Sequence, residues 1–184
     1  MRVDLNAELV RIAALAGELA SPGEELTGVL ATEPEDGIRV YLCAFEGDER
    51  SWVALDRDGR PLRDRAIVRS AVSVAALCEL AEESAGGGQL EELRAQLQTL
   101  RVTEQPEGIE EAEAAVANLQ RTLVRPPRLA SPAYLDAIGI ATRRLERALG
   151  EGPGSPFAEA MKQGIAVVAE LERDVLGGYK TGLG

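Results

Sequence analysis

Apolar residues recur every three or four positions over the first twenty residues, which is the spacing of one face of an α-helix. The apolar positions are Leu5, Leu9, Ile12, Ala16 and Leu19. Charged residues fall on the other side of the same helical wheel, so we expect an amphipathic helix here. Ser21 follows this helix and stands three residues before Glu24, as in a capping box, which predicts one further helical turn.

The pattern then changes to the two-residue period of β-strands. Three segments, residues 27–33, 38–46 and 50–56, are rich in β-branched and aromatic residues. The sequences PEDG and GDE, which favour turns, separate them. The middle segment is largely apolar on both faces. We therefore expect it to be the central strand of a three-stranded antiparallel meander, covered on both sides.

From Asp64, a predicted N-cap, the helical period returns. The helix that follows is apolar around most of its circumference, which predicts a buried central helix. Residues 90–100 and 109–123 carry narrow apolar seams at three-four spacing, and their short connection predicts an antiparallel pair. Ser-Pro pairs at residues 131–132 and 155–156 predict the starts of two final helices. On the second of these helices, one apolar face is expected to be buried, and it carries Phe157, Met161, Ile165, Val168, Leu171 and Val175.

The predicted fold class is α+β, with an N-terminal helix and a three-stranded meander followed by a mostly helical bundle packed on the buried central helix. We expect a single domain over residues 1–184. Within it, residues 1–62 form the helix and meander, residues 63–178 the helical part and residues 179–184 a loose tail. The helix-meander-helix order resembles the first half of the acidic secretion-chaperone and YbjN-like folds, although helices here replace the strands that follow. That resemblance implies dimerisation and binding of partner chains.

The net charge and the composition of the chain exclude several classes of partner and catalytic site. The chain carries a formal net charge of −11, which repels phosphate backbones, so we expect no nucleic-acid partner. It contains no histidine, which excludes Ser-His-Asp and Cys-His catalysis and histidine-liganded metals. Cys43 and Cys78 stand among apolar neighbours and are predicted to be reduced core thiols. With no apolar run long enough to span a membrane and no secretion signal, we expect a cytoplasmic protein.

Acidic residues crowd the predicted turn after the central helix. They are Glu79, Glu82, Glu83, Glu91 and Glu92. The first three share one side of the last helical turn, and the other two return beside them if the glycines at 86–88 reverse the chain. Carboxylates held close together can bind a hard divalent cation, so this is a candidate metal site. The alternative is a solvated helix end in an acidic protein.

This arrangement resembles the all-α nucleotide pyrophosphohydrolases of the MazG type over residues 79–92. In that family, paired acidic residues on two neighbouring helices hold magnesium for attack on a nucleoside triphosphate. The resemblance implies Mg²⁺ as cofactor and a phosphorylated small molecule as substrate. The family's second acidic motif, Glu followed three residues later by Asp, is missing, since Leu93, Arg94 and Ala95 follow the last two glutamates.

Arginines concentrate where the meander ends and the central helix begins. The candidate anion-binding residues among them are Arg63, Arg65 and Arg69. Arg65 and Arg69 are four residues apart and so lie on one helix face. Guanidinium groups at a helix N-terminus suit phosphate or carboxylate ligands. Aspartates interleaved with these arginines offer the alternative of local ion pairs.

The leading interpretation is a non-enzymatic cytoplasmic protein that acts through protein-protein association. The association is with itself, as a possible homodimer, or with a partner in a chaperone- or adaptor-like role, and it requires no cofactor. Leucine seams on separate helices and an acidic surface support it, although such seams are also typical of an intramolecular core. The alternatives are a Mg²⁺-dependent hydrolase of a phosphorylated small molecule and a regulator that binds an anionic effector.

Overall fold

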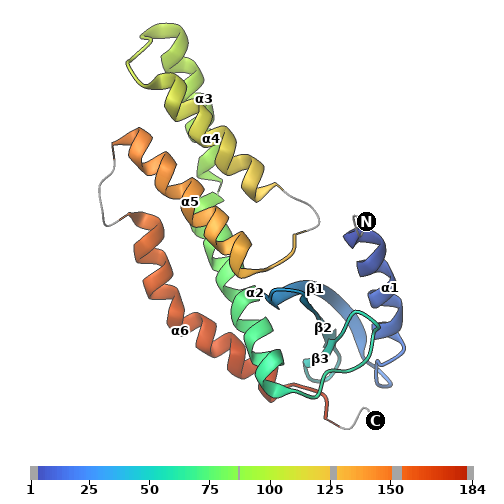
Figure 1. Cartoon of the computed structure of the whole chain (residues 1–184). Helices are drawn as coiled ribbons and strands as arrows, with labels where there is room; N and C mark the ends of the chain where they lie inside the picture. The colour runs from blue at the N-terminus through green and yellow to red at the C-terminus, as the bar shows by residue number, and fades with distance from the viewer. Residues whose placement is uncertain (1–3, 87, 125–127, 151–154, 182–184) are drawn as a thin grey trace. The chain divides into compact units, whose positions relative to one another are not determined.

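The structure, a computed structural model, describes residues 4–86, 88–124, 128–150 and 155–181. A helix, an antiparallel sheet and a run of helices follow one another, which confirms the α+β class (Figure 1). In chain order the elements are α1 (Leu5–Gly17), β1 (Glu25–Glu35), β2 (Ile38–Glu46), β3 (Ser51–Leu55), α2 (Arg65–Gly86), α3 (Gln89–Thr103), α4 (Ile109–Leu123), α5 (Pro132–Leu149) and α6 (Pro156–Gly177).

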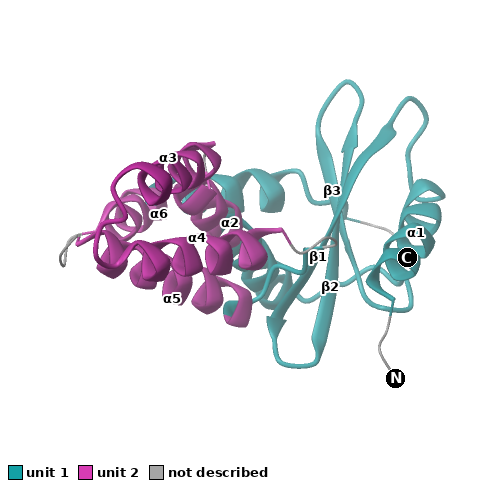
Figure 2. Ribbon diagram, turned by 90° about the horizontal axis from the view of Figure 1, so that it is seen from above, with its two compact units in different colours: residues 1–76, 127–132, 166–184 teal, residues 77–126, 133–165 magenta. Residues whose placement is uncertain are grey.

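The chain divides into two compact units (Figure 2). Unit 1 comprises residues 1–76, 127–132 and 166–184, and unit 2 comprises residues 77–126 and 133–165. Helices α2 and α6 each contribute one part to unit 1 and the other part to unit 2. Each unit contains a buried apolar cluster. The single domain expected from the sequence stays a prediction.

The sheet of unit 1 has the strand order β1-β2-β3, and both pairs are antiparallel, as the meander predicts. β2 is the central strand, and four consecutive residues from Val40 to Cys43 are buried, so both of its faces are covered. On one face, Ile12 and Ala16 of α1 pack in a cluster with strand residues that include Phe45. The apolar positions spaced along α1 therefore form its contact with the sheet.

The segment between α1 and β1 differs from the predicted helical turn. The Ser21 N–H donates to Glu24 Oε2 at 2.7 Å, which is the backbone bond that a capping box forms. No helix follows, because the chain makes a tight turn with Gly23 at φ +88° and enters β1 at Glu25. The residues that would have continued the helix, from Glu25 onward, instead pair with β2 as a strand.

A network of ion pairs fixes α1 to the sheet. Glu8 is only 9 % exposed, and its carboxylate lies 3.1 Å from Arg39 Nη1 of β2 and 3.0 Å from Arg57 Nε. Arg39 also bonds Glu33 of β1 at 2.9 Å. Burial alone would raise the pKa of Glu8, but contacts with Tyr41 and Arg57 and the two guanidinium charges hold that pKa below its ordinary value.

The C-terminal segment closes the outer edge of β3. The Trp52 N–H donates to the carbonyl of Gly178 at 2.9 Å, and the Lys180 N–H donates to the carbonyl of Trp52 at 2.8 Å. Tyr179, between these two residues, forms a parallel bridge with Trp52. The predicted loose tail is therefore wrong for residues 179 and 180, whereas residues 182–184 lie outside the described residues.

The side chain of Lys180 strengthens this attachment. Its ammonium group lies 2.5 Å from Glu24 Oε2 and 4.0 Å from the centroid of the Phe45 ring. Glu24 also accepts a hydrogen bond of 2.7 Å from Ser51. The bond from Lys180, followed by those from Ser51 and Ser21, lowers the pKa of Glu24 to about 2. One salt bridge thus joins the end of the chain to the start of β1.

The outer edge of β1 is closed by a different segment. Ala130, just before α5, accepts a hydrogen bond of 2.7 Å from Glu33 and donates one of 3.1 Å to Ala31. β1 also carries two register shifts in its pairing with β2. Bulges and covering segments both protect a sheet edge from pairing with another chain, so association through the edges of this sheet is disfavoured.

Helix α2 is buried along its length, as its sequence predicts. Val68, Ala71 and Val72 are buried in unit 1, and Cys78 and Ala81 are buried in unit 2. The Asp64 carboxylate accepts from the N–H of Ala66 at 2.9 Å, so the predicted N-cap forms. Within the described residues, none of the helices combines the length and apolar character needed to cross a membrane.

Unit 2 is built on the helical hairpin of α3 and α4 (Figure 1). Glu91 near the start of α3 bonds Gln120 near the end of α4, and Arg101 bonds Glu113 in the opposite order. The two helices are therefore antiparallel, as predicted. Their seams bury leucine and valine side chains in one cluster with residues of α5 and α6: Leu97, Val116, Leu119, Leu123, Ile138, Leu145 and Phe157.

Helix α6 presents a different face from the predicted one. Ile165 and Leu171, expected on the buried face, are 65 % and 36 % exposed. Gly164 is buried in their place, and a Cβ added there would lie only 1.8 Å from Cδ2 of Leu80 in α2. Because α6 approaches Leu80 this closely, glycine occupies the contact and the larger residue beside it is displaced outward.

The substitution Glu8→Ala tests the ion-pair network of unit 1. It leaves the guanidinium groups of Arg39 and Arg57 without their shared carboxylate, so we expect the free energy of unfolding to fall by about 1–3 kcal/mol. Urea unfolding followed by the fluorescence of Trp52, the single tryptophan, measures it. Glu18→Ala removes an exposed glutamate just after α1 and serves as the control. Equal effects of the two substitutions would contradict a structural role for the network.

The low pKa of Glu24 predicts a dependence of stability on pH. Because folding lowers this pKa from 4.5 to about 2, the ionised carboxylate stabilises the fold fully above pH 4.5. That contribution is lost as the pH falls toward 2. The stability difference between the natural protein and Glu24→Gln should therefore be largest near neutral pH and shrink below pH 4.5, as measured by urea unfolding. A difference that stays constant with pH would show that the Lys180 salt bridge does not form.

Candidate functional site

The glutamates at the end of α2 and the start of α3 do not gather into a ligand set. Glu82 accepts a hydrogen bond of 2.8 Å from the Tyr134 hydroxyl, and Glu91 accepts one of 2.9 Å from Gln120. The exposed members are Glu79, Glu83, Glu91 and Glu92. Across the described chain, no three acidic or cysteine residues lie close enough to hold a metal ion. The structure gives no support to the predicted cation site.

The three candidate anion-binding arginines separate into two environments. Arg69 on α2 bonds Glu172 of α6 at 2.7 Å, which neutralises its charge. Arg63 and Arg65 line a cavity of about 290 Å³ in unit 1 together with Lys180. Arg63 and Arg65 therefore share a cavity, and Arg69 does not line it. From the sequence, Lys180 was assigned to a loose tail, so its place in the lining of the same cavity as these arginines was not predicted.

The two cysteines are buried thiols, as predicted. Cys43 lies in the core of unit 1 and Cys78 is buried in α2, and both are free of disulfide bonds. Burial raises the pKa of Cys43 to about 12, because the thiolate would lose its hydration. Cys43 is therefore a protonated core residue and not a nucleophile.

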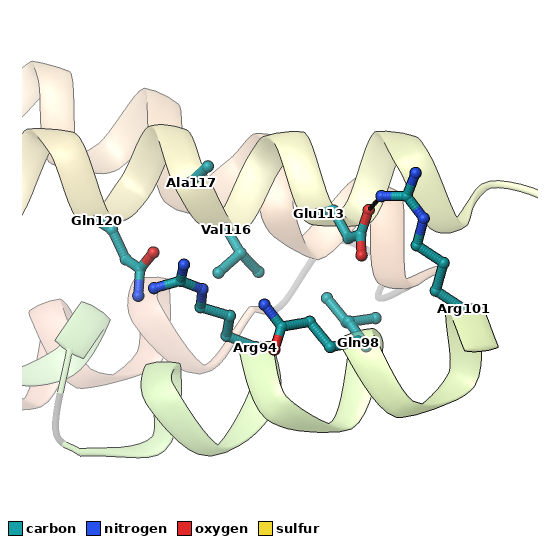
Figure 3. Close-up of a pocket in the computed structure, with 8 residues that line it drawn as sticks. Arg94, Gln98, Arg101, Glu113, Val116, Ala117 and Gln120 are labelled. Carbon is teal, nitrogen blue, oxygen red and sulfur yellow. Dashed lines mark hydrogen bonds and ion pairs between the residues drawn. The ribbon is translucent and has the colours of Figure 1, made fainter. Parts of the chain in front are cut away.

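A groove between α3 and α4 is a candidate binding site (Figure 3). It has a volume of about 230 Å³ and lies wholly within unit 2. Buried Leu97 and Val116, with Ala117, form its apolar floor. The polar lining residues are Arg94, Gln98, Arg101, Glu113 and Gln120. Each helix lines the groove at intervals of three and four residues, which is the spacing that a docked helix requires.

The rim of the groove carries positive charge in an otherwise acidic protein. Arg101 is 56 % exposed and bonds Glu113 at 2.8 Å, which satisfies only part of its five-donor guanidinium group. Arg94 and Gln98 are exposed and point from α3 toward α4 (Figure 3). Among the residues that line the groove, two guanidinium groups therefore face one carboxylate. Glu91, which accepts a hydrogen bond of 2.9 Å from the lining residue Gln120, adds a second carboxylate beside the groove.

The lining residues can bind a ligand, but they supply no nucleophile. They contain no serine, threonine, cysteine, histidine or lysine, and their one carboxylate, Glu113, is already paired with Arg101. Guanidinium and amide groups recognise carboxylates and amides by forked hydrogen bonds. The groove is therefore suited to recognition and not to proton transfer or covalent catalysis.

Sequence reasoning recognised the seams of α3 and α4 and missed the groove beside them. Residues 94, 97, 98 and 101 of α3 and residues 113, 116, 117 and 120 of α4 follow the spacing of one helix face. That spacing was visible in the sequence. The outward direction of the face was not, because it depends on where α5 and α6 pack.

A second exposed surface lies on α6. Residues 165–169 are five consecutive apolar residues, Ile-Ala-Val-Val-Ala, and Leu171 follows after one glutamate. Ile165 is 65 % exposed and Val167 is 60 % exposed. Comparisons with protein-family models, curated proteins and solved structures found no match to the chain, so these surfaces carry the functional argument.

Proposed function

We propose that the protein acts through protein-protein association and that it associates with a second copy of itself through the outer surface of α6. One observation carries the proposal: α6 is apolar around its circumference from residue 165 to residue 169, yet much of this stretch is exposed. Helices that are apolar all round are normally buried. The exposed apolar surface of α6 is therefore suited to burial against another chain.

The energetics favour a symmetric interface. Full burial of one valine, leucine or isoleucine side chain contributes roughly 1.5–3 kcal/mol to the free energy of association. A side chain that is already half covered in the monomer contributes a corresponding fraction of that free energy when its exposed part is buried. A two-fold axis uses the same surface twice, so each exposed residue contributes once from each copy. The principal contributors are Ile165, Val167 and Leu171. Segments of the chain itself pair with part of each sheet edge, which disfavours association through the edges.

Light scattering at micromolar concentration tests the self-association. We expect a dimer or larger species for the natural chain and a monomer for Val167→Asp, because a charge at the interface would be buried without a partner. Val102→Asp is the matched control, since Val102 is a valine that is 83 % exposed on a different helix, α3. A natural chain that remains a monomer across this concentration range would contradict the proposal, as would an equal effect of both substitutions.

Binding of an anionic effector is a second candidate function. The observation in its favour is the cavity of about 290 Å³ that Arg63, Arg65 and Lys180 line. Tyr179 and Thr181 also line it and offer hydroxyl groups. Arginine side chains bind phosphate and carboxylate oxygens by charge-assisted hydrogen bonds. A small phosphorylated or carboxylated molecule fits this chemistry, and its binding would need no catalytic group.

Thermal unfolding in the presence of pyrophosphate tests the effector site. We expect pyrophosphate to raise the Tm of the natural chain, because a ligand that binds only the folded state stabilises it. Arg65→Ala should abolish the rise, whereas Arg69→Ala should retain it, since Arg69 is paired with Glu172 outside the cavity. An unchanged rise in Arg65→Ala would rule out this cavity as the site.

A further inference from the structure

The rim of the α3-α4 groove repeats a positive charge at a defined interval. Arg94 and Arg101 both line the groove from α3 and stand seven residues apart. At about 1.5 Å per residue, seven residues correspond to roughly 10.5 Å, which is close to two helical turns. The two guanidinium groups therefore lie on the same side of α3. Leu97 and Gln98 fall between them, so an apolar floor separates the two charges.

We infer that this groove binds an acidic amphipathic helix of a different protein. The matching segment carries two acidic side chains seven residues apart and an apolar side chain midway between them. The acidic side chains pair with Arg94 and Arg101, and the apolar side chain covers Leu97 and Val116. The inference extends the proposed association function to a hetero-partner on a surface separate from α6.

A helix is the occupant that the groove shape favours. The lining residues of both α3 and α4 recur at three- and four-residue intervals, and a third helix laid along them would insert its side chains between those rows. Gln98 adds an amide group that hydrogen-bonds carboxylates or other polar side chains of such a helix, whereas the Gln120 amide already donates to Glu91. Arg101 retains donors for an incoming carboxylate after bonding Glu113, because one guanidinium has five N–H groups.

The partner is a different chain because the described helices of this chain lack the matching pattern. None of the described helices carries two acidic residues seven positions apart: seven residues after Glu79, Glu91 and Glu159 stand Gly86, Gln98 and Ala166.

Fluorescence anisotropy with synthetic helical peptides tests the inference. The probe is a labelled alanine-based peptide of about 18 residues, with two glutamates seven positions apart and a leucine midway. The matched control peptide has the same composition with its glutamates five positions apart, which places them on different sides of the helix. We expect the seven-residue spacing to bind the natural chain at least about tenfold more tightly than the control.

Charge reversal locates the binding. Arg94→Glu should weaken binding of the seven-spaced peptide at least about tenfold and should improve binding of a peptide with lysines in place of the glutamates. Arg144→Glu reverses an exposed arginine of α5 that does not line the groove, and it should leave both affinities unchanged. Arg94 is exposed, so Arg94→Glu is expected to fold, and its unfolding midpoint confirms this.

Equal binding of the two glutamate peptides, or equal effects of Arg94→Glu and Arg144→Glu, would overturn the inference. Absence of peptide binding to the natural chain would overturn it as well. Light scattering on the same samples reports self-association independently, and Val167→Asp should leave peptide affinity unchanged because Val167 lies on α6. A chain that dimerises without binding the peptides would refute peptide binding in the groove and would leave the proposed self-association standing. A monomeric chain that binds the seven-spaced peptide would refute self-association and would leave peptide binding standing.

Discussion

A three-stranded sheet leaves a row of backbone N–H and C=O groups unpaired at each of its two edges, and unit 1 is organised around closing them. Ala130 closes part of β1, and residues 178–180 close β3. Each closing segment comes from a part of the chain far from the sheet in sequence. Helices α5 and α6 lie between these two segments in the chain.

The parts of the fold that depend on local pattern could be predicted from the sequence. The central position of β2 follows from apolar residues on both of its faces, and the buried length of α2 follows from its apolar circumference. The parts that depend on distant contacts could not. Ser21 and Glu24 formed their local hydrogen bond, but strand pairing decided the backbone that followed. On α6, the contact of Gly164 with Leu80 turned Ile165 outward, and no local pattern indicates that contact.

The candidate sites show the same division. Clusters of like residues were visible in the sequence, but the partners that bond them were not. Arg69 forms an ion pair with Glu172, and Glu91 accepts a hydrogen bond from Gln120, each on another helix. The residues that line the groove between α3 and α4 follow helical spacings that are visible in the sequence. Their polar members, however, look like any solvent-exposed helix face in the sequence, because the sequence does not show where the neighbouring helices pack. The function proposed for this chain therefore rests on surfaces, which a residue-by-residue search for reactive groups does not detect.

The docking of Gly178, Tyr179 and Lys180 on β3 has a consequence for synthesis on the ribosome. The α3-α4 hairpin has contacts between residues close in sequence, so it can form while translation continues. Unit 1 cannot be completed until its last residues have left the exit tunnel, because its final β-pairing partner is synthesised last. A stalled or prematurely terminated chain would therefore expose the edge of β3 and present chaperones and proteases with an unfinished sheet.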